Sequence, residues 1–374
     1  MNPQKLFCPN MECPARGQVG KGNIHTHSLK DKRHMCEVCR QTFATTSGTI
    51  FYRLRHAPEV VIQVITLLAY GCPVQAIVKA FGLDERTVRD WLARAGQHCQ
   101  QFHEHLVENS QHDLQQVQAD EIKVKIQKGI IWMALAIWVP TRLWLGGVIS
   151  PKRDLELIQT LADKVKKMAL CRPLLLAVDG LTSYVSAFRN AFRSKFPRSE
   201  AERGRCKMVA WSDIAIVQVV KQRIDGVLNL ERRIVQGAKS LVENLIKTTQ
   251  GQGVINTAFI ERLNATFRQR LSSLTRRTRT LAQRTETLAT GMYLVGCFYN
   301  FCDFHHSLRL KLSVGSFGYR WVQRTPAIAS RLTDHQWTPA ELFDFKIPPP
   351  PWQLPKQRGR PSIALLQLAQ QWAS

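Results

Sequence analysis

The chain of 374 residues has no long hydrophobic run. Its longest apolar stretch, Ile130–Val139, is ten residues long and is followed by Pro140, whereas a membrane-spanning helix needs about twenty apolar residues. The N-terminal residues also lack the apolar core of a secretory signal. We therefore expect a cytoplasmic protein with no membrane partner, whose ten cysteines are thiols or metal ligands rather than disulfides.

Acidic residues are scarce. Asp and Glu number 28 against 52 Lys and Arg, so the formal net charge is +24. This excess favours a polyanionic partner, most simply nucleic acid, and disfavours an enzyme that acts on small cations. Because 44% of the residues are hydrophobic, the chain can bury a sizeable core, and its length predicts two or three domains.

Residues 1–50 contain too few aliphatic side chains to form a hydrophobic core of their own, so this segment needs a cross-link such as a bound metal. Two short-spaced cysteine pairs lie in this segment: Cys8 and Cys13, then Cys36 and Cys39. Four thiolates on two neighbouring turns can converge on one zinc ion, so we predict a structural zinc ribbon. The alternative is a set of free thiols, as we interpret the six scattered cysteines. Three histidines between the pairs are alternative ligands: His25, His27 and His34.

Residues 57–107 show helical periodicity. Pro73–Ala80 predicts a short helix, Gly82 lies in a turn, and Asp84 is a suitable N-cap for a second amphipathic helix. Such a unit places its second helix in the major groove of DNA, and we expect base and phosphate contacts from its leading end. The alternative is an ordinary pair of packed helices.

Three apolar runs after residue 117 predict a meander of strands: Ile122–Ile126, Ile130–Val139 and Leu143–Ile149. A crossover helix over residues 154–170 then leads into a buried strand over residues 173–178. This fourth strand is expected to lie parallel to the first and beside it. Asp120, at the start of the first strand, and Asp179, after the fourth, would then be neighbours in a catalytic position.

A third acid, Glu261, begins a long helix rich in arginine. Three converging carboxylates repel one another and need a cation, for which magnesium is suited because it prefers hard oxygen ligands. The alternative is that Asp120 and Asp179 are strand-end caps and that Glu261 is a helix N-terminal acid favoured by the dipole. Glu121 is the main rival of Asp120, but strand alternation predicts that it faces away from the site.

The order of these features resembles the DDE transposases of bacterial insertion sequences. The strongest match is Phe259–Arg270, which contains Glu261, and further matches lie at residues 177–184, 274–278 and 299–302. The resemblance covers roughly residues 5–345. The 81 residues between Asp179 and Glu261 form a longer connection than in compact members, and a basic helix over Asn229–Thr249, within an insertion at about 222–252, is expected to account for it.

The resemblance implies a multidomain chain with a zinc ribbon (1–50), an all-α helix-turn-helix domain (57–107), an α/β ribonuclease H-like catalytic domain with a mixed sheet (112–310) and a C-terminal tail (311–374). It implies Mg²⁺ or Mn²⁺ at Asp120, Asp179 and Glu261, structural Zn²⁺, and cleavage and strand transfer of the element's own ends. The expected partners are double-stranded DNA, as element ends and target, and further copies of the chain in a synaptic complex within the bacterial nucleoid.

Polar and basic residues of several segments are expected to contact DNA: Arg86, Thr87, Arg89, Asn264, Arg268, Arg276, Arg277, Arg358 and Arg360. The last two lie in Arg358-Gly359-Arg360-Pro361, which is similar to the core of an AT-hook, an arm that enters the minor groove. The alternative for this stretch is a solvated basic tail.

Two other functions compete with a transposase. One is a transcription regulator that uses only the zinc ribbon and the helix-turn-helix and has an inert core. The other is a structure-selective nuclease with the same acids. The presence of all three acids favours an enzyme, and the two DNA-binding modules at the N-terminus favour recognition of specific ends.

Overall fold

The structure is a computed structural model that describes residues 3–126, 129–196, 205–224, 227–251, 253–274, 284–315, 318–354 and 361–372. The chain divides into two compact units, one formed by Met1–Ile62 with Ala340–Ser374 and the other by Gln63–Pro339. The segment predicted as a tail, 311–374, is therefore shared between the two units. None of the described helices is both long enough and apolar enough to cross a membrane.

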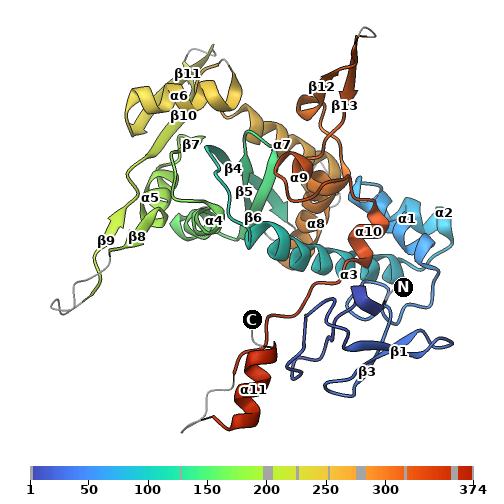
Figure 1. Cartoon of the computed structure of the whole chain (residues 1–374). Coiled ribbons are helices and arrows are strands. Elements are labelled where there is room, and N and C mark those ends of the chain that lie inside the picture. The colour runs from blue at the N-terminus through green and yellow to red at the C-terminus, as the bar shows by residue number, and fades with distance from the viewer. Residues whose placement is uncertain are drawn as a thin grey trace. The chain divides into compact units, whose positions relative to one another are not determined.

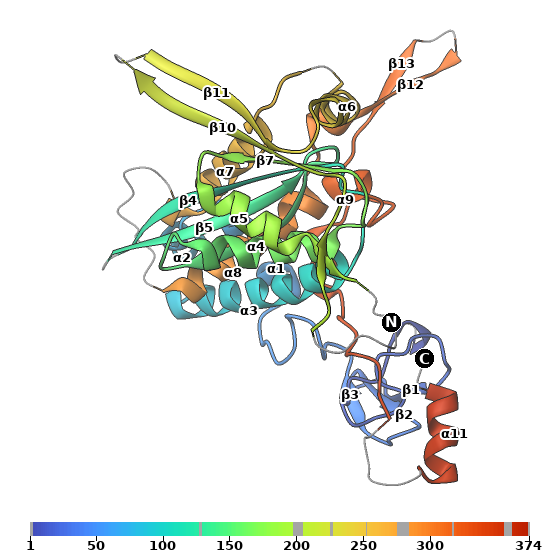
Figure 2. The ribbon, with the colours of Figure 1, turned by 90° about the vertical axis from the view of Figure 1, so that its left-hand side faces the viewer.

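The first unit contains a small antiparallel sheet of β1 (Ile24–Ser28), β2 (Arg33–Cys36) and β3 (Thr42–Ala44). Its core consists of eight buried residues: Leu6, Cys8, Cys13, Ala15, Ile24, Cys36, Phe43 and Trp372. α11 (Ile363–Trp372) lies beside this small sheet (Figure 2). It contributes Trp372, whose backbone carbonyl accepts a 2.6 Å hydrogen bond from Gln18 Nε2. The C-terminal helix thus adds an aromatic side chain to a core that is short of aliphatic residues.

The boundary between the units falls within α1 (Pro58–Ala69), which is followed by α2 (Val74–Phe81) and α3 (Glu85–His103). Gly82 follows α2 in the left-handed conformation with φ 63°, which glycine adopts at little cost. The carboxylate of Asp84 accepts a 2.8 Å hydrogen bond from the backbone N–H of Arg86 and so caps α3. Two helices joined by a tight glycine turn are therefore present where the sequence predicts them.

α3 is longer than a recognition helix needs to be, and it packs along α8 (Thr285–Cys297) of the same unit. The two helices approach closely at Gly96, where an added Cβ would lie 2.0 Å from Cγ2 of Thr290. One face of α3 is buried, from Val88 and Trp91 to Phe102 and His103. α3 therefore begins with an exposed N-terminal end and packs with its buried face in the core of the second unit.

The second unit is built on a six-stranded sheet in the order β11-β10-β7-β4-β5-β6. The three strands that come first along the chain form an antiparallel meander at one side of the sheet: β4 (Gln116–Ile126), β5 (Gly129–Trp138) and β6 (Leu143–Ser150). β7 (Leu174–Asp179) pairs in parallel with both β4 and β10 (Ile214–Ile224), and β11 (Val227–Gln236) is antiparallel to β10. The predicted mixed sheet in a multidomain α/β chain is confirmed. β4 begins earlier than predicted, since buried Gln116 and Gln118 belong to it, so Asp120 lies inside the strand.

Helices cover both faces of this sheet (Figure 1). The crossover helix α4 (Leu155–Met168) and α5 (Thr182–Ala191) lie on one face, and α6 (Lys239–Gln250) and α7 (Ala258–Arg270) on the other. Alternation along the strands agrees with these layers. Leu175 and Ala177 of β7 pack with the buried side of α6, and Gln118 of β4 hydrogen-bonds to the start of α7.

The prediction of a basic helix over Asn229–Thr249 is wrong for its first part. Residues 227–236 form β11, and only Lys239–Gln250 are helical. Leu230 and Ile234 are four residues apart, a spacing that puts both on one face of a strand as well as of a helix, so it does not distinguish the two. Gly237, with φ 94° and Ala215 Cβ only 2.8 Å from the position of a Cβ, then separates strand and helix.

The remaining described elements are shorter: β8 (Arg193–Lys195), β9 (Met208–Ala210), β12 (Leu310–Ser313), β13 (Tyr319–Val322), α9 (Pro326–Ala329) and α10 (Pro339–Asp344). β8 pairs with β9 and β12 with β13, each in an antiparallel hairpin.

Candidate functional site

The four N-terminal cysteines converge in the first unit. Their Sγ atoms all lie within 4.8 Å of one another, with 3.6 Å between Cys8 and Cys39 and 3.9 Å between Cys13 and Cys36. A tetrahedron with Zn–S bonds of about 2.3 Å has S–S edges of about 3.8 Å. The spacing therefore fits a four-coordinate metal, and none of the three histidines between the pairs belongs to the cluster.

Burial makes this cluster costly without a cation. It raises the pKa of the Cys13 thiol to about 12 and raises the pKa of Cys8 as well, and the charge of Cys36 adds to both shifts, whereas at Cys39 hydrogen bonds outweigh burial and lower the pKa. Asn23 Nδ2 donates to Cys36 Sγ at 3.6 Å. A metal ion would stabilise the thiolates that burial disfavours, so the donor set fits a soft or borderline cation.

In the second unit, one cavity of about 490 Å³ is lined by Asp120, Asp179 and Glu261. The last paired residues of β4 and β7, Ala119 and Val178, are partners in the parallel register. Asp120 and Asp179 are the next residues of their strands, so they lie side by side just beyond the last pair of the β4–β7 ladder. Glu261 reaches the cavity from the first turn of α7. The structure thus brings together three carboxylates that are far apart in the sequence.

Gln118 positions the helix that carries Glu261. Its Oε1 accepts hydrogen bonds of 3.0 Å from the backbone N–H groups of Phe259 and Ile260, and its side chain is fully buried. The sequence analysis missed this residue, although a glutamine two positions before Asp120 shares its face of the strand. The start of α7 is consequently tied to β4 next to Asp120.

Asn264 contacts the site rather than solvent. It was predicted to contact DNA, but it is 1% exposed and donates from Nδ2 to Asp120 Oδ2 at 2.8 Å. The spacing of three residues from Glu261 brings both side chains to the sheet side of α7. Asn264 therefore orients the carboxylate of Asp120.

The carboxylate of Glu121 lies with the aspartates, so the prediction that it is directed away from the site is wrong. Ligand oxygens of Asp120, Glu121 and Asp179 lie within 4.8 Å of one another, a group that does not include Glu261. The alternation of side chains along β4 still holds. Glu121 leaves the strand on the side of α5, where Tyr184 donates to its Oε2 at 2.9 Å. β4 pairs with β7 only as far as Ala119. Beyond that point the side chain of Glu121 is long enough for its carboxylate to approach Asp179 at the end of β7.

Two cations that the sequence analysis did not identify line the cavity. Arg153 Nε donates to Glu121 Oε1 at 2.6 Å, and Arg153 also pairs with Asp179 at 3.4 Å. Lys221 on β10 donates to Glu261 Oε1 at 2.5 Å. No local motif marks either residue, because each acquires its partner only through the folding of distant strands.

The surroundings shift the pKa values of three carboxylates in different directions. Burial, followed by the charges of Glu121 and Asp179, raises the pKa of Asp120 to about 7. Burial and Asp179 also raise the pKa of Glu121. For Glu261, burial acts to raise the pKa, but hydrogen bonds from Lys221 and Thr257 outweigh it and lower the pKa. Burial and neighbouring negative charge disfavour the ionised form of Asp120. A hard divalent cation would favour that form, so this set of oxygen donors fits such a metal.

The other predicted DNA contacts differ in accessibility. Arg86 is exposed at the start of α3, and Thr87 is half-buried. Arg89 is exposed but donates from Nε to Glu85 Oε1 at 2.7 Å. Arg268 is half-buried on α7. Four predicted contacts lie outside the described residues: Arg276, Arg277, Arg358 and Arg360.

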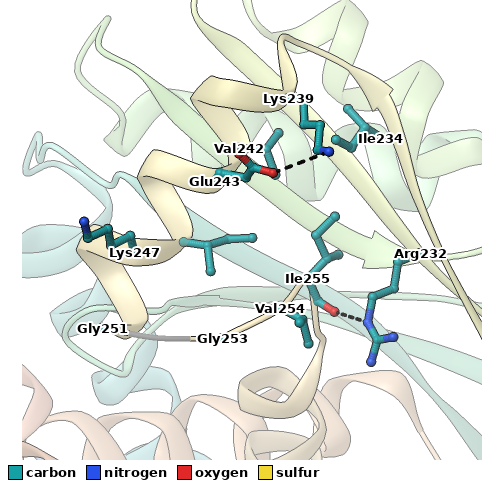
Figure 3. A pocket seen from close by; sticks show the side chains of 11 residues that line it. Arg232, Ile234, Lys239, Val242, Glu243, Lys247, Gly251, Gly253, Val254 and Ile255 are labelled. Carbon is teal, nitrogen blue, oxygen red and sulfur yellow. Dashed lines mark hydrogen bonds and ion pairs between the residues drawn. The ribbon is translucent and has the colours of Figure 1, made fainter.

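A second cavity, of about 480 Å³, lies between β11, α6 and the segment leading to Ile255 (Figure 3). Five of its eleven lining residues are aliphatic and four are charged, with Ile234 and Val242 among the labelled residues. Three of its charged side chains have contacts within the lining: Lys239 pairs with Glu243 at 3.8 Å, and Arg232 donates to the carbonyl of Ile255 at 2.9 Å. No cluster of metal-ligating groups among the described residues faces this cavity, so the carboxylate cavity is the better candidate for chemistry.

A scan against protein-family models gives no match for this chain, and a search of curated proteins gives no significant match.

Proposed function

We propose that this chain is a DDE transposase that binds the ends of its own insertion sequence and catalyses metal-dependent DNA cleavage and strand transfer. The observation that carries the proposal is the convergence of Asp120, Asp179 and Glu261 on one cavity from β4, β7 and α7. Two neighbouring strands and a helix on one face of the sheet supply the three acids that the resemblance implies.

The sheet order supports a ribonuclease H-like catalytic domain. An antiparallel meander is followed by a crossover helix and by a strand parallel to the first, which then pairs with β10. In this arrangement the aspartates lie on the adjacent central strands, one residue beyond the last pair of the β4–β7 ladder, near the strand ends where catalytic groups of α/β sheets gather. The hairpin β10–β11 and α6 fill the long connection to Glu261.

Asp120, Asp179 and Glu261 would hold Mg²⁺ or Mn²⁺. When bound, such ions make a hydroxyl group more nucleophilic and stabilise the leaving oxygen of a phosphodiester. The remaining residues position these ligands: Asn264 orients Asp120, and Gln118 fixes the start of α7. Lys221 pairs with Glu261 and is placed to attract a DNA phosphate.

The DNA-binding part of the proposal uses two modules. The cysteine cluster would hold a structural zinc ion, and the exposed N-terminal end of α3 would enter the major groove. The net charge of +24 supports a polyanionic partner. Joining two element ends to a target requires both ends at once, for which we propose a homo-oligomer.

The test is incubation of the protein with DNA that contains its own gene and both flanks, in the presence of Mg²⁺. We expect nicks at two defined positions that bracket the gene, and joining of the released 3′ ends to a plasmid target. Cutting that depends on DNA structure but not on the flanks would support a nuclease instead. Sequence-specific binding without cleavage under any divalent metal would support a transcription regulator.

The exposed arginines of α3 give a prediction about DNA binding. Arg86→Ala is expected to weaken binding to the flanks by about 1–3 kcal/mol if the side chain contacts a base. Arg89→Ala is expected to have a smaller effect, because Glu85 already pairs with that guanidinium. Fluorescence anisotropy at several salt concentrations measures both variants. Arg172→Ala removes an exposed arginine that pairs with Asp113 and serves as the control. Equal affinity and salt dependence for Arg86→Ala and wild type would show that α3 does not face DNA.

A further inference from the structure

The hairpin β12–β13 has no covered face in the part of the chain that the structure describes. Every residue of both strands is exposed, and the hairpin projects from the rest of its unit in Figures 1 and 2. Antiparallel sheets commonly bury one face, and an isolated two-stranded hairpin is marginally stable in water. The hairpin is therefore a surface that a partner can cover.

The register of the hairpin sorts its side chains into two faces. Directly opposed residues share a face. Lys311 opposes Trp321 and Ser313 opposes Tyr319 on one side, which we call the aromatic face. The other side, the aliphatic face, carries two opposed pairs: Leu310 with Val322 and Leu312 with Arg320.

The aromatic face combines open rings with cations. Tyr319 is 55% exposed and Trp321 is 38% exposed, and their ring centroids lie 5.6 Å apart. Arg309 Cζ lies 3.9 Å from the ring centroid of Trp321, and Lys311 Nζ lies 4.0 Å from that of Tyr319. The rings and the positive charges are thus available to the same ligand.

The charge of this segment identifies the class of ligand. Residues 309–324 contain four basic side chains (Arg309, Lys311, Arg320 and Arg324) and no Asp or Glu. A polyanion fits this charge, and exposed aromatic rings can stack on flat groups such as nucleobases. In a duplex the bases are stacked on one another, whereas unpaired bases are free to stack on protein rings while cations bind the adjacent phosphates.

We infer that the β12–β13 hairpin binds unpaired DNA, with bases stacked on Tyr319 and Trp321 and phosphates bound by Arg309 and Lys311. The biological substrate rests on the proposed function, since cutting and joining of DNA exposes strand ends whose bases can unstack. The binding itself does not require cleavage. It can therefore be tested in a chain whose carboxylate cavity is inactivated.

The test uses the full chain with Asp120→Asn as background, without added divalent metal and with its zinc retained. The probes are a fluorescent single-stranded oligonucleotide of mixed sequence and the same sequence as a blunt duplex, measured by anisotropy. Tyr319→Ala with Trp321→Ala is expected to weaken single-strand binding about tenfold or more, with a much smaller change for the duplex. Tyr319→Phe with Trp321→Phe keeps the rings and is expected to bind within about threefold of the background.

Leu310→Ala with Val322→Ala, on the aliphatic face, is the matched control and should retain single-strand affinity. Unchanged single-strand binding in the Tyr319→Ala, Trp321→Ala chain would overturn the inference. So would equal losses for both faces, or for single strand and duplex. Loss of a dimer in sedimentation, with unchanged DNA affinity, would instead assign the hairpin to contact with a second copy. If wild-type protein never cleaves DNA but these binding results hold, the proposed function fails while the inference about the hairpin stands.

Discussion

Asp120→Asn, Asp179→Asn and Glu261→Gln are each expected to abolish metal-dependent DNA cleavage. The three carboxylates line one cavity from three separate elements and would act as a unit, so losing one costs about as much as losing all. Each amide keeps the shape of its carboxyl group and removes the charge that attracts the cation. We expect cleavage rates below about one-thousandth of wild type. A gel assay of end-labelled flanking DNA measures them.

DNA binding is expected to survive in these variants, because the proposed function assigns it to the cysteine module, to α3 and to basic surface. Asp163→Asn is the control, since Asp163 is exposed on α4 away from the cavity. Glu121→Gln is expected to reduce activity in part, because it perturbs Arg153 and Tyr184 beside the aspartates. Cleavage near the wild-type rate by any one of the three amide variants would contradict the assignment of that residue.

Cys36→Ser is expected to remove the metal from the first unit and to unfold residues 1–50. Cys36 is fully buried beside the other three sulfurs. The small core around it relies on the cysteines and on Trp372, so the metal would supply much of the folding free energy, which in zinc-finger peptides is about 10–16 kcal/mol. Elemental analysis should find about one zinc per chain in wild type and none in the variant. Limited proteolysis should then cut residues 1–50 and release α11.

Cys171→Ser changes an exposed cysteine outside the cluster and should keep both zinc and protease resistance. Stoichiometric zinc in a Cys36→Ser, Cys39→Ser double variant would rule out the cysteine site.

Local patterns in the sequence predict much of this fold. Apolar runs separated by turn residues predict the meander, and Gly82 and Asp84 predict the break and the cap between α2 and α3. The parallel pairing of β4 with β7 follows from the handedness and length of the crossover. The position of Asp120 beside Asp179 follows in turn from that pairing.

Contacts between distant segments are not predicted in this way. Arg153 and Lys221 acquire their acidic partners only when the sheet forms, and Trp372 joins a core more than three hundred residues away. Glu121 was misplaced although alternation holds: its side chain leaves β4 on the side of α5, where Tyr184 donates to it, but it is long enough for the carboxylate to reach Asp179. Asn264 was misplaced because a polar residue on an arginine-rich helix is expected at the protein surface. Here its side chain is buried and donates to the partly buried carboxylate of Asp120.

The central claim is that Asp120, Asp179 and Glu261 form a divalent metal site. Titration of the zinc-loaded protein with Mn²⁺, followed by electron paramagnetic resonance of the free ion, tests it without any DNA or turnover. Wild type is expected to bind Mn²⁺ at this site, and Asp179→Asn is expected to lose that binding, whereas Asp163→Asn should bind as wild type does. Identical binding curves for wild type and Asp179→Asn would contradict the claim.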